Sequence, residues 1–174
     1  MTGDREPEAG RPYIPGYGLS DNDGLLPWSW AEARLSEAHT YWLTTVRPDG
    51  RPHVMPVWGV WLDGRFYFTT GAETRKAKNL ASEPRCVVSA GKGTDDEAVV
   101  LEGRAAVDTD AVTLEKAAQV YNTKYDWSLQ VRDGGVYDET GNGGPMFAVT
   151  PEVVFGFGEE FNSSTRWGFD RVSG

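Results

Sequence analysis

The sequence predicts a mainly β protein with short α-helices, folded as an antiparallel barrel with the helices in its gaps. Strand-like segments of β-branched and aromatic residues recur along the chain, at 41–46, 51–62, 65–70, 85–90, 98–107 and 146–158. Most of these segments follow one another through turns, whereas parallel winding needs a helix between successive strands. With 174 residues, the chain has the size of one domain.

The beginning of the chain differs in composition from the rest. Residues 1–24 are rich in Gly, Pro and Asp, which predicts a flexible arm. The barrel domain is expected to cover residues 25–174. Its first helix is expected over residues 29–39, because Ser29 followed three positions later by Glu32 has the spacing of a capping box.

The next strands predict a meander. The long segment 51–62 and the segment 65–70 are separated by Asp63-Gly64, a two-residue hairpin signal. Pro56 inside the long segment indicates an edge strand or a bulge, because proline cannot donate a ladder hydrogen bond. Together with the strand before them, these segments predict three antiparallel strands in a row.

Two further helices are expected. Thr74 caps a helix over residues 75–82, and Pro84 ends it. A longer helix starts near Asp110 and keeps an apolar face at helical spacing. The residues of that face are Leu114, Ala117, Ala118, Tyr121 and Tyr125. The Gly- and Asp-rich segment 128–145 after it predicts a loop, which we expect to act as a lid.

Composition excludes several kinds of partner and site. The net charge is −9, so neither a nucleic-acid backbone nor an anionic lipid surface is an expected partner. One cysteine, Cys86, and two histidines, His39 and His53, predict no disulfide and no metal site. The sequence has no apolar run of membrane-spanning length and no secretory signal at its start, so we expect a cytoplasmic protein.

The start of the helix over 75–82 carries an unusual concentration of positive charge. Arg75 and Lys76 stand in its first turn, where the helix dipole disfavours cations by a few tenths of a kcal/mol each. A bound phosphate reverses that cost, and the hydroxyls of Thr69 and Thr70 precede the same loop. The alternative is that Glu73 and solvent screen the two cations.

We expect a planar ring to bind next to the phosphate. Residues 53–58 offer flat, apolar and backbone surface, and we expect them to lie beside the two threonines across the Asp63-Gly64 turn. The alternative interpretation of Trp58 is a core or interface aromatic.

These stretches together resemble a known family. DGRPHVMPVWGVWLDGRFYF, the overlapping DGRFYFTTGAETRKAKNLASEPRCVVSA and the later VLEGRAAV are similar to the flavin-binding core of the pyridoxamine 5′-phosphate oxidase-like split β-barrel superfamily. The resemblance covers about residues 40–170, in the expected order.

The resemblance implies a split β-barrel homodimer with two cofactor sites at the subunit interface. It implies that Arg75 and Lys76 hold the cofactor phosphate, that Phe68 and Thr69 lie beside it, and that strand 54–58 lines the ring. The complete set of expected cofactor-binding residues is Met55, Pro56, Val57, Trp58, Phe68, Thr69, Thr70, Arg75, Lys76, Asn79, Arg166 and Trp167.

The sequence also departs from the pyridoxamine phosphate oxidases themselves. Those enzymes carry an Arg and a Lys where this chain has Met55 and Val60, and their C-terminal Arg-x-His has no match in STRWGF. The chain is more similar to the branch that uses the deazaflavin coenzyme F-420, through PHVMPVW, TRKAKNL and TRWGF. We therefore expect an oxidoreductase that transfers a hydride between a deazaflavin, or FMN, and a small organic acceptor; no catalytic residue is assigned.

Three alternatives share this fold and remain open at this point. The first is a non-catalytic flavin- or deazaflavin-binding or sequestering protein. The second is an FMN-dependent oxidase acting on an amine, as the pyridoxamine phosphate oxidases do. The third is a haem-binding member, which the scarcity of histidine disfavours.

Overall fold

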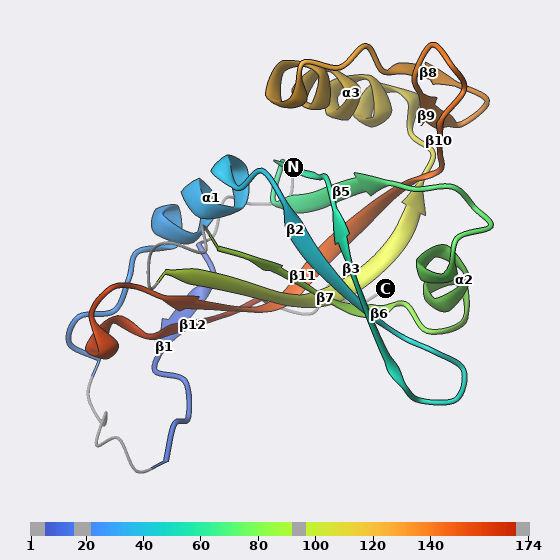
Figure 1. The fold of residues 1–174 in the computed structure, drawn as a ribbon. Helices are drawn as coiled ribbons and strands as arrows, with labels where there is room; N and C mark the ends of the chain where they lie inside the picture. The colour runs from blue at the N-terminus through green and yellow to red at the C-terminus, as the bar shows by residue number, and fades with distance from the viewer. Residues whose placement is uncertain (1–5, 16–21, 92–96, 170–174) are drawn as a thin grey trace.

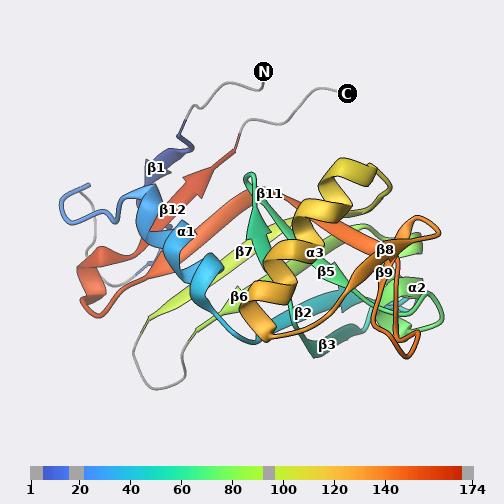
Figure 2. The same ribbon diagram turned by 90° about the horizontal axis from the view of Figure 1, so that it is seen from above.

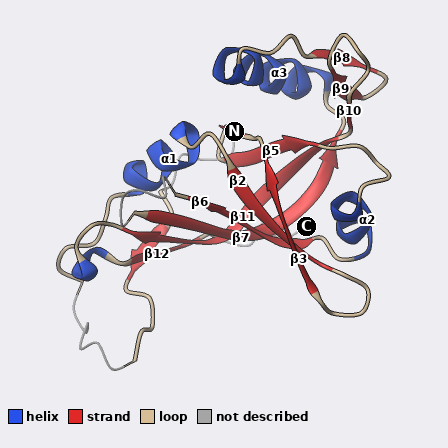
Figure 3. Cartoon of the chain, viewed as in Figure 1, coloured by secondary structure: helices blue, strands red, loops and turns tan. Residues whose placement is uncertain are grey.

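The computed structural model describes residues 6–15, 22–91 and 97–169. A nine-stranded antiparallel sheet forms the body of the molecule, and Figures 1 and 3 show it curling around its own core. Its strands are β1 (Glu8–Gly10), β2 (Tyr41–Val46), β3 (Pro52–Val57), β4 (Val60–Leu62), β5 (Arg65–Thr69), β6 (Arg85–Ala90), β7 (Ala98–Asp108), β11 (Met146–Phe157) and β12 (Thr165–Gly168).

The remaining elements lie on or beside this sheet. The helices are α1 (Trp28–Glu37), α2 (Arg75–Ser82) and α3 (Ala111–Tyr125), with a short 3₁₀ turn, η1 (Phe161–Ser163). A second, three-stranded antiparallel sheet contains β8 (Gln130–Arg132), β9 (Gly135–Tyr137) and β10 (Gly143–Gly144). Figures 1 and 2 show α3 and this small sheet together on one side of the barrel. The expected fold class, mainly β with short helices in an antiparallel split barrel, is confirmed.

Strand β11 explains how the barrel splits. One of its edges pairs with β7 along almost its whole length. The other edge pairs first with β5, from Met146 to Val149, and then with β12, from Val153 to Gly156. Between the two halves a bulge at Pro151 bends the strand, and this bend lets one strand serve two diverging parts of the sheet.

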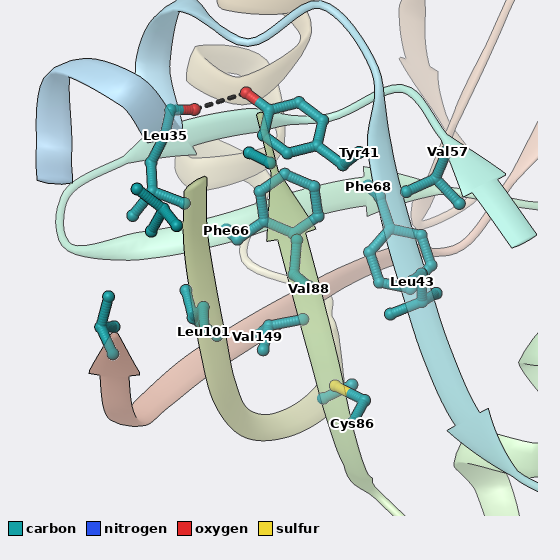
Figure 4. Packing of buried hydrophobic residues seen from close by; sticks show 14 of the residues in the cluster. Leu35, Tyr41, Leu43, Val57, Phe66, Phe68, Cys86, Val88, Leu101 and Val149 are labelled. Carbon is teal, nitrogen blue, oxygen red and sulfur yellow. Dashed lines mark hydrogen bonds between the residues drawn. The ribbon is translucent and has the colours of Figure 1, made fainter. Parts of the chain in front are cut away.

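Two apolar clusters fill the molecule. The larger lies inside the barrel and includes Leu35, Tyr41, Phe66, Phe68 and Val88, all essentially without solvent exposure; Figure 4 shows this packing. The smaller joins α3 and the small sheet to β4, β5 and the start of β11. All five residues predicted for the apolar face of the long helix are buried there.

The expected long strand over residues 51–62 is wrong. The structure breaks it at Trp58 and Gly59 into β3, which pairs with β2, and β4, which pairs with β5. A Cβ at Gly59 would clash with the ring of Phe66, so only glycine allows this close approach. As a result β3 is an edge strand, as Pro56 indicated, but it does not lie beside β5 across the Asp63-Gly64 turn.

The turn and the second helix agree with their sequence signals. Asp63 and Gly64 both have positive φ, 49° and 75°, as a tight hairpin turn requires. Helix α2 begins and ends at the predicted residues, and the hydroxyl of Thr74 accepts a hydrogen bond from the amide of Ala77 at 3.4 Å.

The predicted capping box is wrong. Pro27 is the N-cap of α1, without a side-chain hydrogen bond, and Ser29 already lies inside the helix. The helix starts earlier because Trp28 is buried against three other rings, those of Trp61, Trp167 and Phe169. Packing of this indole therefore outweighs the local capping signal.

Two segments expected to be irregular contain strands. Residues 8–10 of the expected N-terminal arm form β1 and pair with β12; its residues 1–5 and 16–21 lie outside the described residues. The expected loop 128–145 contains β8, β9 and β10. Strands of two or three residues carry too few positions to show an alternating pattern, so the glycines and aspartates dominated the prediction.

Candidate functional site

A cleft of about 410 Å³ lies between the barrel and the unit formed by α3 and the small sheet. One wall, the barrel wall, comes from β3, the end of β5 and α2. The other, the α3 wall, comes from α3 and from the chain between α3 and β10. The lining residues are Pro56, Val57, Trp58, Thr69, Thr70, Gly71, Lys76, Tyr121, Trp127, Ser128, Leu129, Asp138, Asn142 and Gly143.

The barrel wall is flat and apolar where β3 ends. Pro56 and Trp58 are exposed on it, and Val57 between them points into the barrel core. Trp58 is 53% exposed, although its ring contacts that of Trp127. This surface suits contact with a planar ring, because a rigid aromatic edge and a proline ring lose little entropy on binding.

The same wall ends in a cationic pocket at the start of α2. Lys76 is half-buried, and desolvation lowers its pKa below the ordinary lysine value. Glu73 does not neutralise it, because its carboxylate binds Lys78 at 2.8 Å. In the described part of the chain, no carboxylate lies within 4.0 Å of either Arg75 or Lys76.

Hydroxyl groups stand beside this pocket. Thr70 Oγ1 lies 3.2 Å from Thr74 Oγ1, at the point where the chain enters α2. Thr69 Oγ1 donates to the carbonyl oxygens of Gly144 and Pro145 at 3.2 and 3.3 Å. The proton of the Thr69 hydroxyl is thus already donated, and the pocket combines the amino end of α2, the Thr70 hydroxyl and an ammonium without a carboxylate neighbour, which together favour an anion.

The α3 wall is mainly aromatic. The ring of Trp127 stacks on Tyr121, with centroids 5.9 Å apart, and meets Trp58 edge to face at 5.5 Å. Asp138 and Asn142 bring polar groups from the loop between β9 and β10. Hydrogen bonds within that loop, chiefly from Thr140, hold the pKa of Asp138 below its usual range, so the carboxylate stays charged.

Three side chains on one face of α3 fix the position of the barrel wall. Tyr121 Oη donates to the carbonyl oxygen of Trp58 at 2.7 Å. Tyr125 Oη accepts from the Gly59 amide at 3.0 Å and lies 2.8 Å from the Gly59 carbonyl oxygen. Lys124 Nζ donates to the same carbonyl at 3.2 Å. The break between β3 and β4 is thus the point at which the two walls are joined.

Six of the predicted site residues line the cleft together. They are Pro56, Val57, Trp58, Thr69, Thr70 and Lys76. Met55, 42% exposed on β3, and Arg75, exposed on α2, belong to elements of the barrel wall but do not line the cleft.

Four predicted residues lie elsewhere. Phe68 is fully buried in the barrel core, stacked on Phe147. Asn79 belongs to α2 and is fully buried on the face of the helix that packs against β2. Arg166 and Trp167 belong to β12, and the structure does not bring them to this cleft; Trp167 lies in the core of its own chain against Trp28.

The sequence analysis missed the α3 wall almost entirely. Tyr121 was identified only as part of a buried face, although its hydroxyl and ring both reach the cleft. Trp127 directly follows a helix that ends in a left-handed residue, Asp126. An aromatic residue between the end of the predicted helix and a glycine-rich segment is the sequence signal that could have indicated this wall.

Other kinds of site find little support in the described residues. No group of three or more His, Cys, Asp and Glu side chains among them is arranged to hold a metal ion. None of the described helices has both the length and the apolar character needed to cross a bilayer.

Comparisons with known proteins agree with this architecture. The model of a family described as pyridoxamine 5′-phosphate oxidase matches residues 30–152. Among solved structures, General Stress Protein 26 from Bacillus anthracis str. Sterne is 20% identical with a TM-score of 0.61, covering 81% of this chain and 97% of that one. No curated protein matches the chain.

Two further solved structures are similar. An F420 reductase is 23% identical with a TM-score of 0.53, covering 71% of this chain and 94% of that one. An FAD-binding protein from Mesorhizobium loti is 20% identical with a TM-score of 0.57, covering 83% and 96%. At these identities the likeness establishes the fold alone.

Proposed function

Since the chain belongs to the pyridoxamine 5′-phosphate oxidase family, we propose that it is an oxidoreductase that binds the deazaflavin coenzyme F-420, or FMN, in this cleft. The hydride acceptor is a small organic molecule. The observation that carries the proposal is Lys76, a half-buried ammonium without a carboxylate neighbour in the described structure, at the end of a flat apolar wall.

The cofactor phosphate would lie at the start of α2. Lys76 supplies charge, Arg75 supplies a planar guanidinium one residue earlier, and Thr70 supplies a hydroxyl. Burying an unpaired ammonium costs free energy, and an incoming phosphate removes that cost. The residues at this end of the cleft therefore fit a phosphate-bearing cofactor.

The ring system would lie along Pro56, Val57 and Trp58. When bound, a deazaflavin or flavin supplies the hydride chemistry. The chain's own residues position the ring and exclude water, with Trp58 and Trp127 as the aromatic boundary. Tyr121 holds the main chain of Trp58 and is not assigned a proton-transfer role, because burial raises the pKa of its phenol well above its ordinary value.

Pyridoxamine phosphate is not the proposed substrate. The positions that carry an Arg and a Lys in those oxidases are Met55 and Val60 here, and Val60 is buried in the cluster around α3. The C-terminal Arg-x-His that the resemblance associates with that substrate also has no match in STRWGF.

We also propose that the working form is a homodimer. The outer face of β2 and β3 exposes Trp42, Val46 and Val54, which are 52%, 37% and 48% exposed. Large apolar side chains gathered on one face of an edge strand and its neighbour are typical of a protein interface. Arg166, exposed on β12, is a proposed contact to a cofactor bound by the second copy, and residues 25–174 are the proposed cofactor-binding domain.

A fluorescence titration tests the cofactor assignment. Apoprotein is titrated in parallel with coenzyme F-420 and with FMN, and saturable binding of either is expected. Failure of both to bind at concentrations far above physiological levels would end the proposal.

A stopped-flow experiment separates an enzyme from a carrier. The protein-bound cofactor is reduced and mixed with quinone, nitro and unsaturated lactone acceptors. Reoxidation faster on the protein than in free solution is expected for at least one class. A bound cofactor that no acceptor reoxidises faster than the free one would instead indicate a sequestering protein.

A further inference from the structure

His53 lies on β3 within the surface that α2 covers. It pairs with Thr45 in the β2–β3 ladder, and the side chain of Thr45 is fully buried on that face. Asn79 of α2 packs against the same place and is also fully buried. His53 itself is only partly covered, so its ring lies at the border between this buried contact and solvent.

A short chain of polar groups fixes one side of the imidazole. Asn79 Nδ2 donates to Thr45 Oγ1 at 2.9 Å. The Thr45 hydroxyl lies 3.4 Å both from His53 Nδ1 and from the His53 carbonyl oxygen. The Nδ1 edge therefore faces the buried threonine, and Nε2, across the ring, is left to face outward.

The groups around His53 are cationic. Lys76 precedes Asn79 by three residues on α2, so the two side chains leave the same face of the helix. Burial lowers the pKa of His53 below its ordinary value, and the charges of Arg47, Lys76 and Arg75 lower it further. The imidazole is thus neutral near pH 7, and the cations that act on it are Arg47 from the turn after β2 and Arg75 and Lys76 from α2.

The nearby carboxylates are engaged with other cations. Asp49 binds Arg51 at 2.8 Å in the turn before β3, and Glu73 binds Lys78 at 2.8 Å on α2. Within the described chain, no carboxylate lies within 4.0 Å of Arg47 or His53. Among the described residues the cluster therefore has no carboxylate in ion-pair contact, and the negative group whose charge acts on it is Asp49, beside Arg47 in the same turn.

We propose that His53 is a further binding residue of the anion site and donates a hydrogen bond from Nε2 to the phosphate held by Lys76 and Arg75. The inference rests on the proposed function, because it adds a residue to the same phosphate site. An anion placed among these groups favours the charged imidazolium, so binding draws a proton onto His53. Affinity for the phosphate group then rises as the pH falls through the pKa of His53 in the complex.

The chain offers a direct test, because it contains only two histidines. His39 is the internal control: its ring packs on Tyr125, 4.9 Å between centroids, in the α3 contact rather than beside α2. The Cε1–H signals of both residues are followed by NMR as a function of pH, in the free protein and with saturating pyrophosphate, FMN or coenzyme F-420. The pKa of His53 should rise by about one unit or more on binding, the usual effect of a close opposite charge, while that of His39 stays constant.

A matched pair of variants gives the second measurement. His53→Gln keeps a neutral side-chain donor but cannot be protonated, and His39→Gln is its control. At pH 8 all three proteins should bind the anion with similar affinity. The affinities at pH 6 are then corrected for the ionisation of the phosphate itself. After this correction, the wild type and His39→Gln should bind more tightly at pH 6 than at pH 8, and His53→Gln should not. A pH dependence identical in the wild type and in His53→Gln would overturn the proposal.

The outcomes of these measurements distinguish the assignment of His53 from the assignment of the cofactor. If a cofactor binds and the pKa of His53 does not move, the assignment of His53 is wrong while the cofactor assignment holds. If neither cofactor binds but pyrophosphate raises the pKa of His53 alone, the anion site stands without the proposed function. If no anion shifts the His53 signal, or if both histidines shift alike, the inference is overturned.

Discussion

The two walls of the cleft are built in different ways. The barrel wall belongs to the β2–β3 and β5–β11 ladders and to a capped helix, so its backbone hydrogen bonds fix it within the barrel. The α3 wall consists of a helix and strands of two or three residues, held to the barrel by the smaller apolar cluster, by side-chain hydroxyls and by close glycine contacts. The comparison teaches that backbone hydrogen bonds within the barrel fix the strands and helix of the barrel wall, whereas the α3 wall takes its position from side-chain packing and side-chain hydrogen bonds against the barrel.

The strongest test of this difference is Gly144→Ala. Gly144 has a φ of 157°, and a Cβ there would clash with the carbonyl of Thr70, exactly where the two walls meet. Backbone strain and overpacking together should lower the free energy of unfolding by about 3 kcal/mol or more, measured by urea denaturation. Gly64→Ala is the matched control, because φ is also positive there, at 75°, but a Cβ would meet nothing within 4 Å.

Gly64→Ala should lower the free energy of unfolding by only about 1 kcal/mol, the usual effect of placing a residue other than glycine in the left-handed conformation. Equal losses in the two variants would mean that the small sheet is not tied to the barrel at Thr70.

Lys76→Ala tests the barrel wall itself. Removal of its charged contact to the phosphate should weaken cofactor binding by about 1–3 kcal/mol, as measured by equilibrium fluorescence titration. Lys78→Ala makes the same change two residues later, where the lysine is exposed and paired with Glu73, and should leave the affinity nearly unchanged. Similar losses for both variants would point to a diffuse charge effect instead of a phosphate pocket.

Trp127→Ala tests the α3 wall at its aromatic boundary. It removes a ring of the cleft lining that would contact the bound cofactor or acceptor, so affinity should fall by about 0.5–1.5 kcal/mol, the value of one aromatic pair. Trp127→Phe should recover most of this loss, because it keeps a ring in the same place. Unchanged affinity in both variants would restrict the site to the barrel wall.

The smallest effect concerns Lys124, which joins the two walls. Burial lowers its pKa to about 8, while its amine donates to Tyr41 Oη at 2.7 Å and to Gly59. Between pH 8 and the ordinary lysine range the unfolded chain binds more protons than the folded one, so this residue makes stability rise with pH. The wild type should therefore gain stability relative to Lys124→Met from pH 8 to 9.5, in parallel urea titrations.

The comparison with Lys124→Met is needed because Cys86 acts in the opposite direction. Burial raises the pKa of its thiol to about 12, which makes stability fall above the ordinary thiol range in both proteins. A stability difference between the two proteins that does not change with pH would show that Lys124 is not titrating in this window.

The sequence predictions agreed with the structure for much of the barrel wall and missed the α3 wall. Thr74, the helix after it and the Asp63-Gly64 turn were predictable because each signal lies within a few residues of the hydrogen bond or dihedral angle that it controls. Among the predicted cleft residues, Lys76 lies on that helix and Thr69 ends the strand after that turn, whereas Pro56, Val57 and Trp58 come from the segment whose break at Gly59 was not predicted. The capping box at Ser29 failed because burial of Trp28 against distant rings outweighed it.

The sequence by itself determined the antiparallel barrel, the helix that presents Arg75 and Lys76, and the flat apolar end of β3, because alternation, capping and turn chemistry act over short stretches of chain. Only the tertiary structure decided that β3 and β4 separate at Gly59, that β11 serves two parts of the sheet, and that Tyr121 and Trp127 complete the cleft. The α3 wall, the break at Gly59 and the pairing of β11 with β5 depend on contacts between residues more than fifty positions apart, such as Tyr121 with Trp58, and no local pattern encodes such distances.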